Sequence, residues 1–162
     1  MLIGVVADTH ENMPLIAKAV AYFNQQKVDL VIHAGDIISP ICALLLEKLE
    51  APVAAVFGNN DGDHALWQEK IKNFGEIHDA PWAYVRQGYS FLVMHEPRDI
   101  DREAASQKYD AIIYGHLHRV DRRVIGKTLI INPGECGGWQ YGRHTVALLR
   151  FPERTAEIVD LD

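Results

Sequence analysis

The stretch from Leu2 to His10 constrains the fold more than any other part of the sequence. An uninterrupted apolar run from Leu2 to Ala7 stops abruptly at Asp8, and His10 follows two residues later. Such a run predicts a buried strand that presents polar side chains at its carboxyl end. Carboxylate oxygen and imidazole nitrogen are ordinary ligands of divalent metals. Alone this pair is weak evidence, but three later strands are predicted to end in the same way.

The first half of the chain predicts parallel strands that alternate with helices. The expected strands cover residues 2–7, 30–33 and 53–57, and the expected helices cover about 12–26, 39–49 and 63–74. Asn12, Ser39 and Asp63 are predicted to cap the helix starts, and Gly75 is predicted to end the third helix in a left-handed conformation. Right-handed crossovers then place the strand ends, including Gly35-Asp36 and Gly58-Asn59, around one crevice.

The second half changes to hairpins and predicts a different sheet. The expected elements are strands at 82–86 and 89–94, a short helix at about 99–108, and strands at 111–114, 120–125, 128–131, 145–151 and 156–160. His95 closes the first hairpin, and Gly115-His116-Leu117-His118 follows the strand at 111–114. The second sheet is therefore also expected to deliver polar side chains at strand ends.

Seven candidate ligands follow these apolar runs. They are Asp8, His10, Asp36, Asn59, His95, His116 and His118. Seven ligands are enough for two ions when one carboxylate bridges them, and Asp36 is the natural bridge. Two carboxylates leave two divalent ions with a net charge of about +2, which favours an anionic substrate and lowers the pKa of a bridging water.

The motifs Asp8-x-His10, Gly35-Asp36, Gly58-Asn59, His95 and Gly115-His116-x-His118 closely resemble those of the calcineurin-like metallophosphoesterase superfamily. The short chain and its Asn132-Pro133-Gly134 element are similar to the small YfcE-type phosphodiesterases. The resemblance implies one α/β domain over residues 1–162, built as a four-layer αββα sandwich of two mixed sheets flanked by helices. It implies one metal on Asp8, His10, Asp36 and His118, and another on Asp36, Asn59, His95 and His116.

The resemblance further implies a phosphodiesterase in which a metal-activated hydroxide attacks the phosphorus. Asp36 and His95 would act through the metals and the bridging hydroxide. Much of the superfamily has a histidine after the metal-binding asparagine, but this chain has Asn60, which we expect to contact phosphate. Many members have an aspartate where this chain has Ser39. These departures leave the ligand set intact and put protonation of poor leaving groups in question.

Composition narrows the functional classes. A net charge of −6 argues against a broad nucleic-acid-binding surface. The sequence contains no run of eighteen apolar residues, so no membrane span is predicted. Cys42 and Cys136 show no disulfide or zinc-binding spacing. We expect a cytoplasmic protein, monomeric or homo-oligomeric, that acts on a small phosphodiester. Mn²⁺ is expected to support activity, with Zn²⁺, Ni²⁺ or Fe as alternative ions.

Two other functions stay open at this point. One is a phosphomonoesterase or nuclease of the same superfamily, and the other is a non-catalytic scaffold similar to the retromer subunit Vps29. The remaining histidines are interpreted as structural; they are His33, His64, His78 and His144. Arg98 and Arg119 follow ligand motifs and are interpreted as solvated or ion-paired residues. The roles of Trp82, Tyr84, Tyr89 and Trp139 are left undecided.

Overall fold

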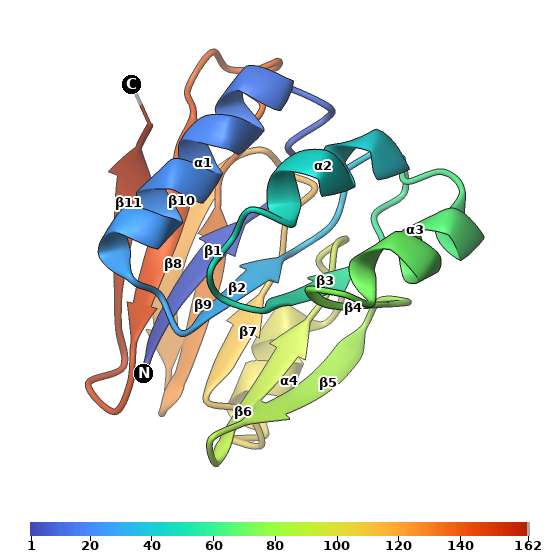
Figure 1. The fold of residues 1–162 in the computed structure, drawn as a ribbon. Helices are drawn as coiled ribbons and strands as arrows, with labels where there is room; N and C mark the ends of the chain where they lie inside the picture. The colour runs from blue at the N-terminus through green and yellow to red at the C-terminus, as the bar shows by residue number, and fades with distance from the viewer. Residues whose placement is uncertain (162) are drawn as a thin grey trace.

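The computed structural model describes residues 1–161 as two β-sheets packed face to face between layers of helix (Figure 1). The strands are β1 (Leu2–Val6), β2 (Leu30–His33), β3 (Val53–Val56), β4 (Gly75–His78), β5 (Trp82–Arg86), β6 (Tyr89–Val93), β7 (Ala111–Ile113), β8 (Val120–Ile125), β9 (Thr128–Pro133), β10 (Thr145–Arg150) and β11 (Thr155–Asp160). The helices are α1 (Met13–Gln26), the 3-10 helix η1 (Pro40–Cys42), α2 (Ala43–Leu46), α3 (His64–Ile71) and α4 (Ile100–Ala105).

Both sheets are mixed. The first has the strand order β11-β10-β1-β2-β3-β4, in which β1 to β4 are parallel and β10 pairs antiparallel with β1. The second has the order β5-β6-β7-β9-β8, with a parallel centre and an antiparallel strand at each edge. The predicted αββα arrangement is confirmed.

The alternation of side chains along the strands explains the layers. On β1, Ile3 and Val5 point into the core between the sheets, whereas Val6 points into the core under the helices. Figure 1 shows α1, α2 and α3 over the outer face of the first sheet. The outer face of the second sheet packs Leu92 and Ile112 against Ala104 of α4. Because both faces of the central strands are buried, these strands are almost continuously apolar.

Three local predictions were wrong. Gly75 does not end a helix; it begins β4, an edge strand that the pattern did not indicate, and a side chain there would overlap the Val53 carbonyl. The second helix is shorter than expected and ends at Leu46 rather than Leu49. Asn12 precedes α1, but its side chain donates to the Gly137 carbonyl (2.8 Å) and does not cap the helix.

The predicted cap at Asp63 is confirmed, because its carboxylate accepts a hydrogen bond from the Leu66 backbone N–H (3.2 Å). Trp67 and Ile71 are the buried residues of α3. Cys42 and Cys136 are unpaired and buried. Among residues 1–161, no helix has the length and the apolar character that crossing a membrane requires.

Candidate metal centre

The seven predicted ligands converge at the carboxyl ends of five strands. Asp8 and His10 follow β1, Asp36 follows β2, Asn59 follows β3, His95 follows β6, and His116 and His118 follow β7. The His10 Nε2 and His95 Nε2 atoms each lie 3.4 Å from Asp36 Oδ2. The His118 Nε2 atom lies 3.6 Å from Asp8 Oδ1. The two sheets therefore contribute donors to a single cluster, with Asp36 near its middle.

Backbone geometry aims these side chains at one another. Five of the seven adopt left-handed φ angles of 43° to 67°; they are Asp8, His10, Asp36, His116 and His118. Left-handed backbone at non-glycine residues costs free energy and recurs at functional sites, and Asp and Asn tolerate it better than most residues. The Asp8 N–H donates to the Gly35 carbonyl and the His10 N–H to the Asp36 carbonyl, both at 3.1 Å.

Two glycines allow the loops to approach closely. A Cβ atom at Gly35, where φ is +93°, would lie 2.6 Å from His95 Nδ1. A Cβ atom at Gly58 would overlap the Asp36 carboxylate. Any larger residue at either position would displace a candidate ligand.

Hydrogen bonds fix which histidine nitrogens face the centre. His95 Nδ1 lies 2.8 Å from the Ala34 carbonyl and His118 Nδ1 lies 2.8 Å from Glu135 Oε2. Both partners only accept, so each Nδ1 carries a proton and Nε2 is the nitrogen that faces the cluster. His95 Nε2 and His116 Nδ1 both lie 2.9 Å from Asn59 Oδ1. His95 Nε2 thus faces the oxygens of both Asn59 and Asp36, a contact that needs a proton or a cation. Burial opposes protonation of His95, but Asp36 outweighs it and raises the pKa of the ring.

A buried nitrogen without a partner also fits a cation. His10 Nε2 is buried and makes no hydrogen bond, although it lies 3.9 Å from Asp8 Oδ1 and 3.4 Å from Asp36 Oδ2. Two donors that are each about 2.1 Å from a tetrahedral ion lie about 3.4 Å apart. Two groups have mutually close donor atoms: Asp8 with His10 and His118, and Asp8 with Asp36 and His95. The donor set and its spacing fit divalent metal ions.

The two carboxylates have opposite pKa shifts. Burial raises the pKa of Asp8 to about 7, although His95 and His118 favour its ionised form. Burial also opposes ionisation of Asp36. Hydrogen bonds from His95 and from the side chain and backbone of Asn60 outweigh this effect and hold the pKa of Asp36 well below its usual value. Burial lowers the pKa of His10, which favours the neutral ring that a metal binds. The cluster thus already holds one carboxylate and one imidazole in their ligating forms.

Glu135 is a residue of the centre that sequence reasoning missed. Its carboxylate is buried and accepts from His118 Nδ1 (2.8 Å), the Gln140 N–H (3.0 Å) and the Tyr141 N–H (2.5 Å). Burial raises the pKa of Glu135, but these hydrogen bonds outweigh it and lower the pKa. Glu135 directly follows the Asn132-Pro133-Gly134 element, and that position was the only signal that could have found it.

A second supporting carboxylate is Asp61. It accepts from the backbone N–H groups of Asp36 (3.0 Å), Ile38 (2.5 Å) and Gly58 (2.7 Å), and so ties the loop after β2 to the loop after β3. Burial raises the pKa of Asp61. The Gly58-Asn59-Asn60-Asp61 run contains this residue, but its spacing alone did not assign a role to the carboxylate.

His33 supports the centre through hydrogen bonds to the loops that carry its residues. Its Nδ1 accepts from the Gly35 N–H (3.2 Å), so Nε2 carries the proton and donates to Thr9 Oγ1 (3.2 Å), which contacts the Asp36 carbonyl (3.4 Å). Complete burial lowers the pKa of His33 to about 3. The neutral ring therefore links the ends of β1 and β2 without adding charge.

Asn60 faces the Asp36 carboxylate. Its backbone N–H donates to Oδ1 (2.9 Å) and its side-chain amide donates to Oδ2 (2.8 Å). Contact with phosphate requires the amide to leave Oδ2. Ser39 lies outside the cluster, where its hydroxyl accepts weakly from the Ile41 N–H (3.4 Å).

The remaining candidates have structural contacts of their own. Arg98 pairs with Glu96 (2.8 Å), and Arg119 donates to the Tyr141 hydroxyl (3.1 Å). Trp139 is exposed and donates to the His10 carbonyl (3.3 Å). Three hairpin aromatics, Trp82, Tyr84 and Tyr89, pack against the core between the sheets.

Comparison with known proteins agrees with this geometry. Residues 1–154 match the calcineurin-like phosphoesterase superfamily domain. The chain is 37% identical over 153 residues to Phosphodiesterase MJ0936 of Methanocaldococcus jannaschii, covering 92% of each protein. It superposes on the solved structure of a novel archaeal phosphodiesterase with a TM-score of 0.91 and 33% identity, over 99% of both chains. YfcE from E. coli, at 18% identity with a TM-score of 0.60 over all of both chains, shares the fold.

The family model covers nearly the whole chain, and the 37% identical relative covers 92% of it. The chain belongs to the calcineurin-like phosphoesterase superfamily.

Proposed function

We propose that this protein is a metal-dependent phosphodiesterase whose seven clustered donors hold two divalent ions. The observation that carries the proposal is the meeting of two imidazole nitrogens at Asp36, where His10 Nε2 and His95 Nε2 lie 3.4 Å from the same carboxylate oxygen. A shared carboxylate between two imidazoles is the arrangement that a bridged pair of ions requires. The similarity to Phosphodiesterase MJ0936 supports the same reaction class.

The ions would divide between the two ends of the cluster. Asp8, His10 and His118 would hold one, Asn59, His95 and His116 the other, and Asp36 would contact both. Bound divalent ions neutralise a phosphodiester's charge and lower the pKa of water. Mn²⁺ is the ion that we expect to support activity in an assay, with Zn²⁺, Ni²⁺ or Fe as alternatives.

The protein side chains set the position of the reacting groups. Glu135 and the Ala34 carbonyl hold the rings of His118 and His95 with their Nε2 atoms facing the centre. Asp61 holds the loops that carry Asp36 and Asn59 at a fixed separation. Such rigid placement is what in-line attack on phosphorus demands.

Elemental analysis and a diester assay test the proposal together. Metal-loaded protein should contain two ions per chain and should hydrolyse an activated diester such as bis(p-nitrophenyl) phosphate. Asp36→Asn should lower kcat at saturating metal by at least about a hundredfold, more than loss of a terminal ligand, because Asp36 spaces the two ends of the cluster. Asp63→Asn is the matched control, since asparagine also caps α3.

The alternatives predict different outcomes. At most one ion per chain, or full activity of Asp36→Asn, would contradict a bridged pair of ions. A phosphomonoesterase would prefer p-nitrophenyl phosphate to the diester, and a nuclease would cleave oligonucleotides better than small diesters. A scaffold similar to Vps29 would turn over none of these substrates at any metal loading.

A further inference from the structure

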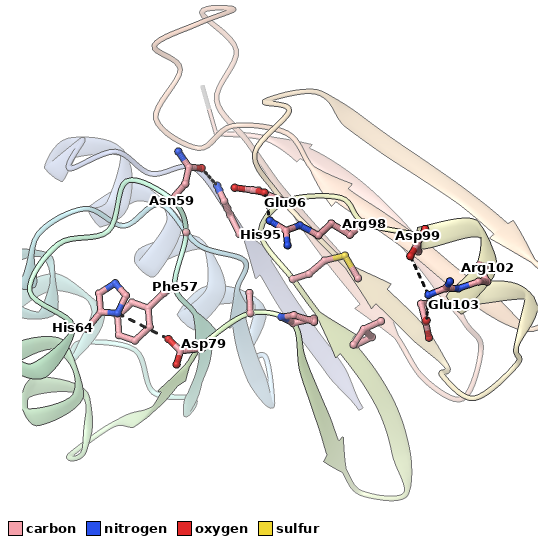
Figure 2. A pocket seen from close by; sticks show the side chains of 15 residues that line it. Phe57, Asn59, His64, Asp79, His95, Glu96, Arg98, Asp99, Arg102 and Glu103 are labelled. Atoms are coloured by element: carbon pink, nitrogen blue, oxygen red, sulfur yellow. Dashed lines mark hydrogen bonds and ion pairs between the residues drawn. The ribbon is translucent and has the colours of Figure 1, made fainter.

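A pocket of about 410 Å³ opens beside the Asn59 and His95 end of the candidate metal centre (Figure 2). This volume lies in the range of about 300 to 1,000 Å³ that small-molecule sites occupy. The pocket extends from the end of β3 past the start of β5 to α4. A substrate whose phosphate lies at the metal centre therefore has room for one of its ester groups on this side.

Part of the pocket lining is apolar or aromatic. Pro81, Leu92 and Met94 contribute apolar surface. At one end, the rings of Phe57 and His64 are stacked parallel, with centroids 3.7 Å apart and an interplanar angle of 1°. Figure 2 shows this pair on one side of Asn59 and His95. These surfaces favour a planar, apolar group over a flexible polar one.

The charges around the pocket disfavour a second anion. Four carboxylates line it; they are Asp79, Glu96, Asp99 and Glu103. Its two cations are already paired, because Arg98 contacts Glu96 at 2.8 Å and Arg102 contacts Asp99 at 2.9 Å (Figure 2). The lining therefore carries a net negative charge, which opposes a further phosphate or carboxylate on the bound group.

We propose that this pocket selects small phosphodiesters in which one ester group is an uncharged ring, such as an aryl group or a nucleoside without further phosphates. The inference rests on the proposed function, because the pocket gains its meaning from a phosphate at the adjoining centre. Because Asn59 and His95 belong to both the pocket and the candidate metal centre, the pocket would receive an ester group of the bound diester. The stacked rings and the net negative charge set the chemistry of that part.

Diesters that share a p-nitrophenyl leaving group isolate the second ester group. With metal-loaded wild-type protein, phenyl p-nitrophenyl phosphate should have a KM at least about tenfold lower than methyl p-nitrophenyl phosphate, because the pocket buries the ring. The 4-carboxyphenyl analogue should lose most of that advantage. Equal KM values for the phenyl and methyl diesters, or for the phenyl and carboxyphenyl diesters, would overturn the inference.

A filled pocket gives an independent test. Ala80 is exposed and lines the pocket, so Ala80→Trp should raise the KM of the phenyl diester about tenfold while leaving the methyl diester little changed. Ala21→Trp is the matched control at an exposed position of α1. Equal effects of the two variants would contradict the assigned pocket. A wild-type protein that hydrolyses no diester would instead contradict the proposed function.

Discussion

Glu135→Gln is the perturbation that tests how the centre is held. The substitution preserves the size of the side chain but replaces one carboxylate oxygen with an amide group that only donates. In the structure Oε2 accepts from His118 and Gln140, and Oε1 accepts from Tyr141. Whichever way the glutamine amide is turned, its NH₂ group meets at least one N–H donor.

The expected losses follow from these contacts. A donor left without an acceptor in a buried site costs about 1 to 3 kcal/mol, so the free energy of unfolding of the metal-free protein should fall by that amount. When the amide faces His118, the ring no longer has a carboxylate to fix its tautomer and orientation. Loss of such a partner lowers metal affinity about 10- to 100-fold, which corresponds to about 1.4 to 2.7 kcal/mol.

Two measurements separate these effects. Calorimetric titration of the metal-stripped protein with Mn²⁺ measures the change in Kd, and urea unfolding without metal measures the change in stability. Glu157→Gln is the control, because Glu157 is exposed on β11 and its ion-pair partner, Arg150, is 3.9 Å away. An unchanged Kd alongside reduced stability would show that Glu135 holds only the loop around Gln140 and Tyr141, and would refute the role of Glu135 in orienting His118.

Three further predictions concern Asn60, His33 and Asp61. Asn60→His supplies a general acid that asparagine lacks, so hydrolysis rates for diesters with alkyl leaving groups should rise by up to about 10²- to 10⁴-fold, and rates for diesters with phenol leaving groups far less. Plots of log rate against leaving-group pKa that are parallel for wild type and variant would exclude this role. Burial lowers the pKa of His33 to about 3 in the fold, against about 6.5 for an exposed histidine. The unfolded chain therefore binds more protons below pH 6.5, and between pH 7 and pH 5 urea unfolding should show wild type losing about 2 kcal/mol more stability than His33→Gln. Asp61→Ala leaves three backbone N–H groups without their acceptor and should lower the free energy of unfolding by about 3 kcal/mol or more, whereas Asp63→Ala should lower it by about 1 kcal/mol because α3 loses its cap. Equal losses would argue that Asp61 does not hold the two loops together.

The strands of the core could be predicted from the sequence because buried strands consist almost entirely of apolar residues. The runs that became β1, β2 and β7 are apolar on both faces, and each ends at a polar residue where the chain reaches the edge of the sheet. That coincidence of a buried run with a polar end also predicted which side chains would meet at the centre.

Features that depend on contacts distant in sequence were harder to predict. In β4, Ile77 is the only fully buried residue, and the strand exists because its backbone pairs with β3. Glu135 is 17 residues from His118, and the bend that brings them together is stabilised by Glu135 itself. Asn12 had the residue type of a helix cap, but Gly137, 125 residues away, provides its partner. Local pattern cannot record such partners, because nothing near these residues differs from an ordinary loop.

The origin of the candidate ligands in two sheets affects more than the reaction. Asp8, Asp36 and Asn59 come from the first sheet, whereas His95 and His118 come from the second. Ions held by both groups would cross-link the two halves of the sandwich and would bind the unfolded chain far less well. Free metal at about a hundred times its Kd would then add about 2.7 kcal/mol to the free energy of unfolding. The lifetime of the folded chain would therefore depend on the metal supply around it, even where no substrate is present.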